Sequence, residues 1–347
     1  MATQGPSRSV YAFVAGAAVG LFLATVGFAL VLKSSSGPGG GGKAGGGART
    51  LTLAHVLEPT HPVHLGMEHM AKRVDELSGG ALQLIVYHSG QLGTETDCLE
   101  RLQAGSLDIT KVSTASLESF VPEMAVFGMP YVFRDHDHFW NVLKSPIGEK
   151  LLQGGQSANV HGLCYFDAGA RSFYTTSKPI LSPADVRGMK IRVLRSKTAM
   201  DMIEAMGGLP TPIAWGELYT AIQQRMVDGA ENNPPSFVSS RHYEVAKHYT
   251  LNEHTHTPDI VLMATNTWAS LDAAQRQVVE QAARESSDFQ RKLWEEKSKQ
   301  DMELLANQGV KIYKVDQEPF RKAVEPMIRS YDGTPAGAII EQIRKVP

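Results

Sequence analysis

Strand-like and helix-like segments alternate along the chain from about residue 50 onward, and this order restricts the possible folds more than any other feature. Residues 50–56 and 82–86 have the apolar alternation of strands, and the segment 63–77 between them carries apolar side chains at helical spacing. A further helix and a strand over 107–113 continue the series. Because parallel strands need crossover connections, this order predicts a mostly parallel α/β sheet whose ligands bind beyond the carboxyl ends of its strands.

A second series of the same kind begins after Gly162. Its predicted elements are strands at 163–166, 189–193 and 227–231, and helices at 198–206 and 217–224. Two successive series of strands and helices predict an α/β protein with two lobes.

The segment 272–308 contains neither glycine nor proline, and Gly309 ends it. As one helix it would be about 55 Å long, which exceeds the width of a single lobe. The segment therefore favours one helix that spans both lobes. Two helices separated near Ser286 and Ser287 are the alternative.

The N-terminal part of the chain has a different composition. Residues 10–32 include no charged side chain, and as a helix they would extend roughly 35 Å, enough to cross a bilayer. The segment is longer than the apolar part of a cleaved signal peptide and lacks a clean A-x-A site, so we expect an uncleaved signal anchor. Eight of the eleven residues from 37 to 47 are glycine, which predicts a flexible tether with a reach of roughly 20 Å.

Composition and charge exclude several functional classes. The formal net charge is -2 and no Lys/Arg-rich run is present, so no nucleic-acid partner is expected. The two cysteines, Cys98 and Cys164, are too few for a disulfide framework or a cysteine-based zinc site. They could form one bridge, but two buried free thiols are the favoured interpretation.

Catalytic and cofactor motifs are absent from the sequence. It contains no GxSxG, no P-loop, no GxGxxG after a strand and no HExxH, so we predict neither an enzyme nor a cofactor. The nearest metal-like group is His61, His64 and His69, whose spacing places two of the three on different helix faces. No metal site is predicted, and a metal-dependent hydrolase is the least favoured alternative.

Arg192 lies inside an apolar strand, where an unpaired charge is costly. Its guanidinium must either pair with an internal carboxylate or face a cleft, where its planar fork would match a ligand carboxylate. The residue alone leaves these two interpretations open. Asn232 follows another predicted strand, in a stretch that is also typical of a simple turn.

Several stretches resemble the substrate-binding proteins of TRAP transporters, the DctP-like family, from about residue 51 to the C-terminus. The matching stretches are SGQLG at 89–93, FGMPY at 127–131, GARSF at 169–173, DVRGMKIRV at 185–193, 212–223, and DGAENNP at 228–234. The resemblance implies two α/β lobes joined by a hinge that includes a long helix. It also implies a periplasmic monomer that delivers an organic acid to a two-part, ion-gradient-driven permease.

The resemblance also implies roles for individual residues of the second lobe. Arg192 is expected to clamp the ligand carboxylate, with Arg171 as a second cationic contact. Asn232 is expected to orient the carboxylate, and Trp215 to form an apolar wall.

The first lobe is expected to face the ligand from the other side. His55, at a strand end, and Glu95, near a helix N-terminus, are the candidate contacts, and Ser113 follows a third strand end. His55 could equally be a core or surface histidine, and Glu95 could simply stabilise the helix dipole. As a ligand contact, Glu95 would suit hydroxyl groups, since like charges repel.

The sequence pattern predicts residues 1–32 as N-terminal tail and membrane anchor and 33–49 as tether. The resemblance implies 50–168 with 258–297 as lobe I, and 169–257 with 298–347 as lobe II. An anchored periplasmic protein follows, or a free periplasmic one if the N-terminal segment is cleaved. An anchor is a departure from the family, whose members are usually released.

Two further departures concern the body. His88 replaces a proline that is common before the SGQLG stretch, and Asn233 lengthens the Glu-Asn-Pro element by one residue, as in a sugar-acid-binding branch. We therefore expect a uronate or a related sugar acid. The alternatives are a C4-dicarboxylate or keto acid, with Arg171 as the second cation, or a tethered sensor that presents its ligand to a receptor.

Overall fold

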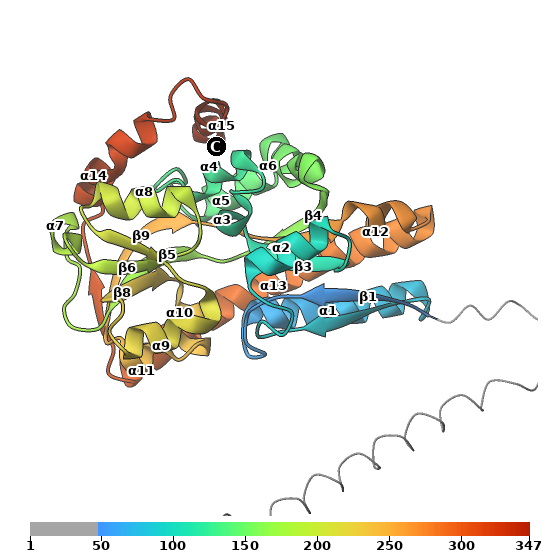
Figure 1. Ribbon diagram of the computed structural model, residues 1–347, viewed down its shortest axis with the longest axis horizontal. Helices are drawn as coiled ribbons and strands as arrows, with labels where there is room; N and C mark the ends of the chain where they lie inside the picture. Colours follow the sequence, from blue (N-terminus) through green and yellow to red (C-terminus); the bar gives the residue numbers. More distant parts are fainter. Residues whose placement is uncertain (1–47) are drawn as a thin grey trace, which may run out of the picture. The chain divides into compact units, whose positions relative to one another are not determined.

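The computed structural model describes residues 48–347, which form two β-sheets with helices packed on their faces (Figure 1). The predicted anchor and nearly all of the predicted tether lie outside these residues. Within 48–347, no helix combines the length and apolarity needed to span a membrane.

The first sheet has the strand order β2-β1-β3-β10-β4. Its strands are β1 (Arg49–Ala54), β2 (Leu82–Tyr87), β3 (Ile109–Ser113), β4 (Val160–Phe166) and β10 (Asp259–Ala264). β1 pairs in parallel with β2 and β3, whereas β10 runs antiparallel to β3 and β4.

The second sheet has the order β11-β9-β5-β8-β6-β7. Its strands are β5 (Ala170–Thr175), β6 (Lys190–Val193), β7 (Leu209–Pro212), β8 (Gly229–Asn232), β9 (His248–His256) and β11 (Lys311–Lys314). β6 pairs in parallel with β7 and β8, and β9 with β11, but β5 runs antiparallel to both β8 and β9.

The sheets are therefore mixed, where the sequence pattern predicted mostly parallel ones. The exceptions, β5 and β10, are the strands that the chain enters directly from the other sheet. β4 ends at Phe166 and β5 begins at Ala170; β9 ends at His256 and β10 begins at Asp259. Each short link starts its strand at the sheet edge where the neighbouring strands end, so β5 and β10 run opposite to those neighbours.

Helices follow most strands. They are α1 (Pro62–Ser78), α2 (Glu95–Gln103), α3 (Thr114–Leu117), α4 (Ala125–Gly128), α5 (His136–Leu143), α6 (Pro146–Leu152), α7 (Pro183–Val186), α8 (Lys197–Ala205), α9 (Leu218–Gln223), α10 (Pro234–Ser239), α11 (His242–Val245), α12 (Thr265–Ser270), α13 (Ala273–Asn307), α14 (Glu318–Arg329) and α15 (Pro335–Lys345). Short 3₁₀ turns lie at Pro122–Met124, Gly154–Ala158 and Trp215–Glu217.

α13 is the predicted long helix, and it is continuous. Asp272 caps its first turn by accepting from the Gln275 N–H, while the Gln275 side chain accepts from the Asp272 N–H. Ser286 and Ser287 do not break the helix; each hydroxyl donates to a backbone carbonyl, of Gly66 and Tyr165 respectively. The helix packs against α1 and β4 of the first sheet and against α10 beside the second.

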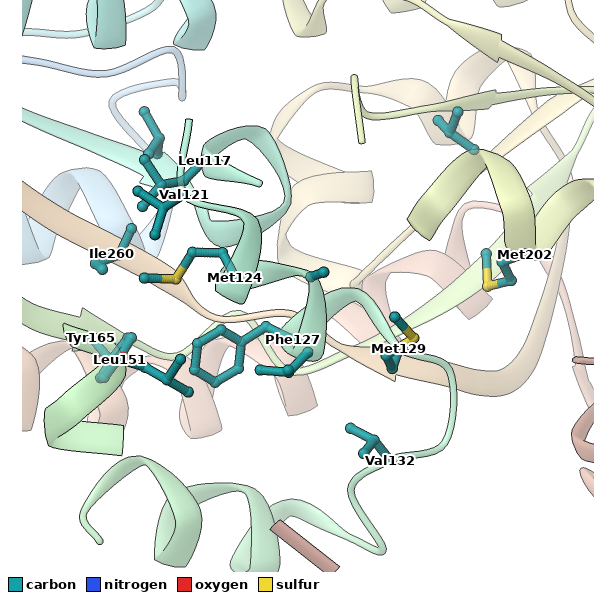
Figure 2. Packing of buried hydrophobic residues seen from close by; sticks show 14 of the residues in the cluster. Leu117, Val121, Met124, Phe127, Met129, Val132, Leu151, Tyr165, Met202 and Ile260 are labelled. Carbon is teal, nitrogen blue, oxygen red and sulfur yellow. The ribbon is translucent and has the colours of Figure 1, made fainter. Parts of the chain in front are cut away.

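Three apolar clusters hold these layers together. One lies between the first sheet and α1 with α13, and another between the second sheet and α9 to α11. The largest continues from the first sheet to α8 of the second, and Figure 2 shows part of it, with Met124, Phe127, Ile260 and Met202. Cys98 and Cys164 are buried free thiols, as predicted, and burial raises the pKa of both.

The C-terminal helices divide between the two sheets. α14 packs against α7 and α8, whereas α15 packs against α4 and α6 of the first-sheet layer. The lobe boundaries given above, which place all of 298–347 in lobe II, remain a prediction about which parts move together.

Candidate functional site

A pocket lies between elements of the two sheets and encloses about 750 Å³ of empty space, including the part open to solvent. Three strands line it near their carboxyl ends: Ser113 ends β3, Asn232 ends β8, and Arg192 is the penultimate residue of β6. The antiparallel strands β5 and β10 line it at their starts, through Arg171 and Asp259. The predicted contacts Arg192, Arg171, Asn232, Trp215, Glu95 and Ser113 all line this one pocket.

Arg192 has an unusual position among the pocket residues. Its side chain is 1 % exposed, Nε donates to the Ile213 carbonyl at 2.9 Å, and Nη1 is buried with no hydrogen-bond partner between residues 48 and 347. No carboxylate of that part of the chain forms an ion pair with it. Burial lowers the pKa of its guanidinium, although an arginine stays charged at neutral pH. The internal pair that the sequence left open is thus not formed.

Arg171 has the opposite arrangement. Its Nε and Nη2 donate to both oxygens of Glu231, at 2.5 and 2.9 Å, and Nη1 donates to Asn232 Oδ1 at 2.9 Å. His254 Nε2 lies 3.3 Å from Glu231 Oε2. Burial opposes ionisation of Glu231, but Arg171 and His254 outweigh it and lower the pKa of that carboxyl to about 2. The charge of Arg171 is therefore balanced within the protein.

Trp215 and Asn232 shape the second-sheet side of the pocket. The Trp215 ring lies 5.7 Å from the Arg192 guanidinium carbon, and its Nε1 donates to Glu58 Oε1 at 3.3 Å. The Asn232 carboxamide oxygen accepts from Arg171 and from the Asn233 N–H. Its amide nitrogen is the group that remains to donate to a ligand.

A second buried charge cluster forms the first-sheet side. Lys111 Nζ lies 3.0 Å from Asp259 Oδ2 and 3.6 Å from Glu95 Oε1. Glu95 also accepts from the Ser113 N–H at 3.1 Å and from Ser116 Oγ at 2.5 Å. Burial raises the pKa of Asp259 to about 6, although Lys111 acts against this shift.

His55 is the predicted contact that does not line the pocket. It is 1 % exposed, its Nε2 lies 3.1 Å from His64 Nδ1, and its Nδ1 accepts from the Leu57 N–H. Burial lowers its pKa well below the usual value. This is the core-histidine interpretation that the sequence left open.

The three histidines of the metal alternative have separate environments. His61 caps α1 and lies in the pocket, with Nε2 3.1 Å from Ser236 Oγ, whereas His69 stacks on Phe289. Across residues 48–347 no group of three or more possible ligands is arranged to hold a metal ion.

Sequence reasoning missed several pocket residues, of which Lys111 and Asp259 are the most informative. Lys111 carried a usable signal, because it is a charge inside the apolar strand β3, just as Arg192 is in β6. Ser236 and Trp294 had none, since each enters the pocket through the packing of helices α10 and α13.

Comparisons with known proteins agree with this geometry. Residues 53–334 match the family described as "Bacterial extracellular solute-binding protein, family 7". A solute-binding protein of Chromohalobacter salexigens is 36% identical over 274 residues, which cover 79% of this chain and 82% of that protein.

Solved structures are similar over nearly the whole body. A TRAP periplasmic solute-binding protein from a Bradyrhizobium species, in complex with D-galacturonate, is 37% identical with a TM-score of 0.83, covering 85% of this chain and 99% of that one. One from Pseudomonas putida with bound D-glucuronate is 35% identical with a TM-score of 0.83, covering 86% and 97%. With a two-sheet body that matches the family model over residues 53–334, this chain belongs to the DctP family, the family-7 bacterial extracellular solute-binding proteins.

Proposed function

We propose that this protein is the periplasmic component of a TRAP transporter and that it captures a uronate for the membrane permease. The observation that carries the proposal is the guanidinium of Arg192, which is buried in the pocket with an unpartnered Nη1 and no internal carboxylate. An uncompensated buried charge costs several kcal/mol, and a ligand carboxylate would remove most of that cost. The bound uronates of the similar solved structures support the ligand class.

In the proposed complex, the uronate carboxylate accepts from Arg192 and from the Asn232 amide. The sugar ring lies against Trp215, and its hydroxyl groups reach Glu95 and Ser113 on the first-sheet side. Charge-assisted hydrogen bonds contribute about 1.5–3 kcal/mol each. Three or four of them, less the cost of ordering, reach the roughly -8 kcal/mol of micromolar binding.

A C4-dicarboxylate is less well suited to this pocket. The sequence offered Arg171 as the cation for a second carboxylate. However, its Nε and Nη2 already donate to Glu231, and its Nη1 donates to Asn232. A second carboxylate at that point would face Glu231 as well as Arg171, and so gain little.

The test is calorimetric titration of the body with D-galacturonate and D-glucuronate. Arg192→Ala should weaken binding by at least about 2 kcal/mol, or roughly 30-fold, because the carboxylate loses its charged partner. Arg187→Ala removes an exposed arginine just before β6 and outside the pocket, so it should bind like the wild type. If Arg192→Ala binds the uronates with near-wild-type affinity, the proposed pairing of Arg192 with the ligand carboxylate is wrong.

We also infer that the body works on a tether. The inference rests on the sequence, in which the uncharged segment 10–32 precedes the glycine-rich segment 33–49. A binding protein that is anchored in the membrane needs a flexible linker so that its body can reach and orient toward the permease. Protein recovered from cells should fractionate with the membrane and retain residues 10–32; a mature chain that begins near Ser34 would reject the tether and leave the binding function intact.

A further inference from the structure

The two sides of the pocket carry opposite and unequal charge. On the second-sheet side, Arg171 and Glu231 cancel, so Arg192 and the exposed Arg195 supply the net positive charge at the pocket wall. On the first-sheet side, one ammonium, Lys111, lies between two carboxylates, Glu95 and Asp259. With both carboxylates ionised this side carries a net negative charge. The Lys111 ammonium on this side is already paired with both carboxylates.

Glu95 is the most exposed member of this cluster. The side chains of Lys111 and Asp259 are 2 % and 9 % exposed, whereas that of Glu95 is 13 % exposed. Ser113, Ser116 and Lys111 fix its two oxygens from the protein side. A carboxylate held in this way has lone pairs left to accept from a ligand hydroxyl and has no proton to donate to a ligand carboxylate.

We propose that Glu95 is a specificity-determining residue that makes the site select sugar acids with one carboxylate and exclude the corresponding diacids. This inference rests on the proposed function. With the C6 carboxylate of a uronate on Arg192, the far end of the sugar presents the C1 hydroxyl, which donates to Glu95. In an aldarate that end is a second carboxylate, which would face the negative charge of Glu95 and Asp259, with Lys111 already paired to both.

Geometry argues against Glu95 as a purely structural helix-capping group. It is the first residue of α2, but the capping contacts of that helix are made by Thr94 and Asp97, each accepting from the other's backbone N–H. Glu95 instead accepts hydrogen bonds from the Ser113 N–H at the end of β3 and from the Ser116 hydroxyl of α3. Its carboxylate is thus positioned by tertiary contacts, and α2 has its cap without it.

The experiment measures the dissociation constants of D-galacturonate and its diacid, galactarate, by calorimetry at pH 7.5. The wild type should prefer the uronate by at least about 100-fold, because two carboxylates at close range repel strongly in a partly buried site. Glu95→Gln keeps the shape and the acceptor oxygen but removes the charge. It should bind the uronate about 10-fold more weakly and the diacid no more weakly, so that the preference falls at least about 10-fold.

Glu100→Gln is the matched control. It removes the same charge from an exposed position of the same helix, outside the pocket, and should leave the preference within about 2-fold of the wild type. Measurable uronate binding by Glu95→Gln shows that the variant is folded.

The outcomes separate the two proposals. A wild type that binds galactarate as tightly as galacturonate, or a Glu95→Gln variant with an unchanged preference, overturns the role of Glu95 and leaves uronate capture standing. A wild type that binds neither uronate overturns the proposed function and this inference with it. An equal loss of preference in Glu100→Gln would assign the effect to overall charge and overturn the role of Glu95.

Discussion

At the scale of single residues, Arg192 and Arg171 show that a buried arginine acquires its role from its neighbours. Both lie in strands of the second sheet and both are buried, yet Glu231 neutralises Arg171 while Arg192 has no such partner between residues 48 and 347. The sequence could identify Arg192 as a charge in an apolar strand. Whether it paired internally depended on which carboxylate the fold brought near it.

His242 provides a prediction about pH at this scale. Burial and then the charge of Arg192 lower its pKa to about 3, so the folded protein keeps it neutral while the unfolded chain takes up a proton near pH 6.5. Between these values the unfolded state binds more protons, and stability must therefore fall as the pH falls. His242 should contribute up to about 1.4 kcal/mol per pH unit to that slope.

The measurement is the free energy of unfolding by denaturant, without ligand, from pH 6 to pH 4. His242→Gln keeps an acceptor for the Tyr174 hydroxyl, 2.9 Å from His242 Nδ1, and should show a shallower slope. Tyr174→Phe removes that hydrogen bond but leaves the buried imidazole, so it should keep the wild-type slope. Equal slopes in wild type and His242→Gln would contradict the assignment.

At the scale of elements, the long helix α13 is the part that the sequence predicted best. Its length follows from a run without glycine or proline. The structure adds the reciprocal cap of Asp272 and Gln275 at its start. The strands β5, β9 and β10 and their antiparallel pairing were not predicted from the sequence, because their pairing partners lie far away in sequence. Gln290 shows what only packing could add: its side chain binds both the N–H and the carbonyl of Asp167, where the chain leaves the first sheet.

The contact of α1 with α13 gives a prediction at this scale. A Cβ atom on Gly66 would lie 2.6 Å from the Phe166 ring and 3.0 Å from Gln290 Cβ, and both neighbours are fully buried. Neither can move freely, because Gln290 is fixed at Asp167. Gly66→Ala should therefore cost about 1–3 kcal/mol of stability by overpacking.

Chemical denaturation with Glu68→Ala as the control tests this contact. Glu68 lies on the exposed face of the same helix, so its truncation should change stability by no more than about 0.5 kcal/mol. A Gly66→Ala variant as stable as the wild type would show that α1 and α13 can separate without cost.

At the scale of the whole body, the pocket is lined by elements of both sheets, and the chain passes from one sheet to the other three times. The crossings are the links 166–170 and 256–259 and the helix α13. Short links and one long helix are suited to a hinge, because few backbone angles need to change. We therefore expect a ligand that contacts both sides to stabilise the closed arrangement.

Small-angle X-ray scattering tests this closure. Saturating D-galacturonate should reduce the radius of gyration of the wild-type body, whereas Arg192→Ala should show no reduction at the same ligand concentration. If calorimetry shows binding but the scattering curve of the wild type does not change, the two lobes do not close on the ligand. The predicted lobe boundaries would then not describe parts that move relative to each other.

The sequence by itself determined the features that depend on near neighbours. These are the helix and strand periodicities, the α/β class, and the choice of Arg192 as a buried charge in need of a partner. Only the tertiary structure decided which charges cancel. Arg171 with Glu231 and Lys111 with Asp259 are pairs separated by 60 and 148 residues. Burial makes such pairs strong and unpaired charges costly, and burial is a property of the assembled sheets that no local pattern contains.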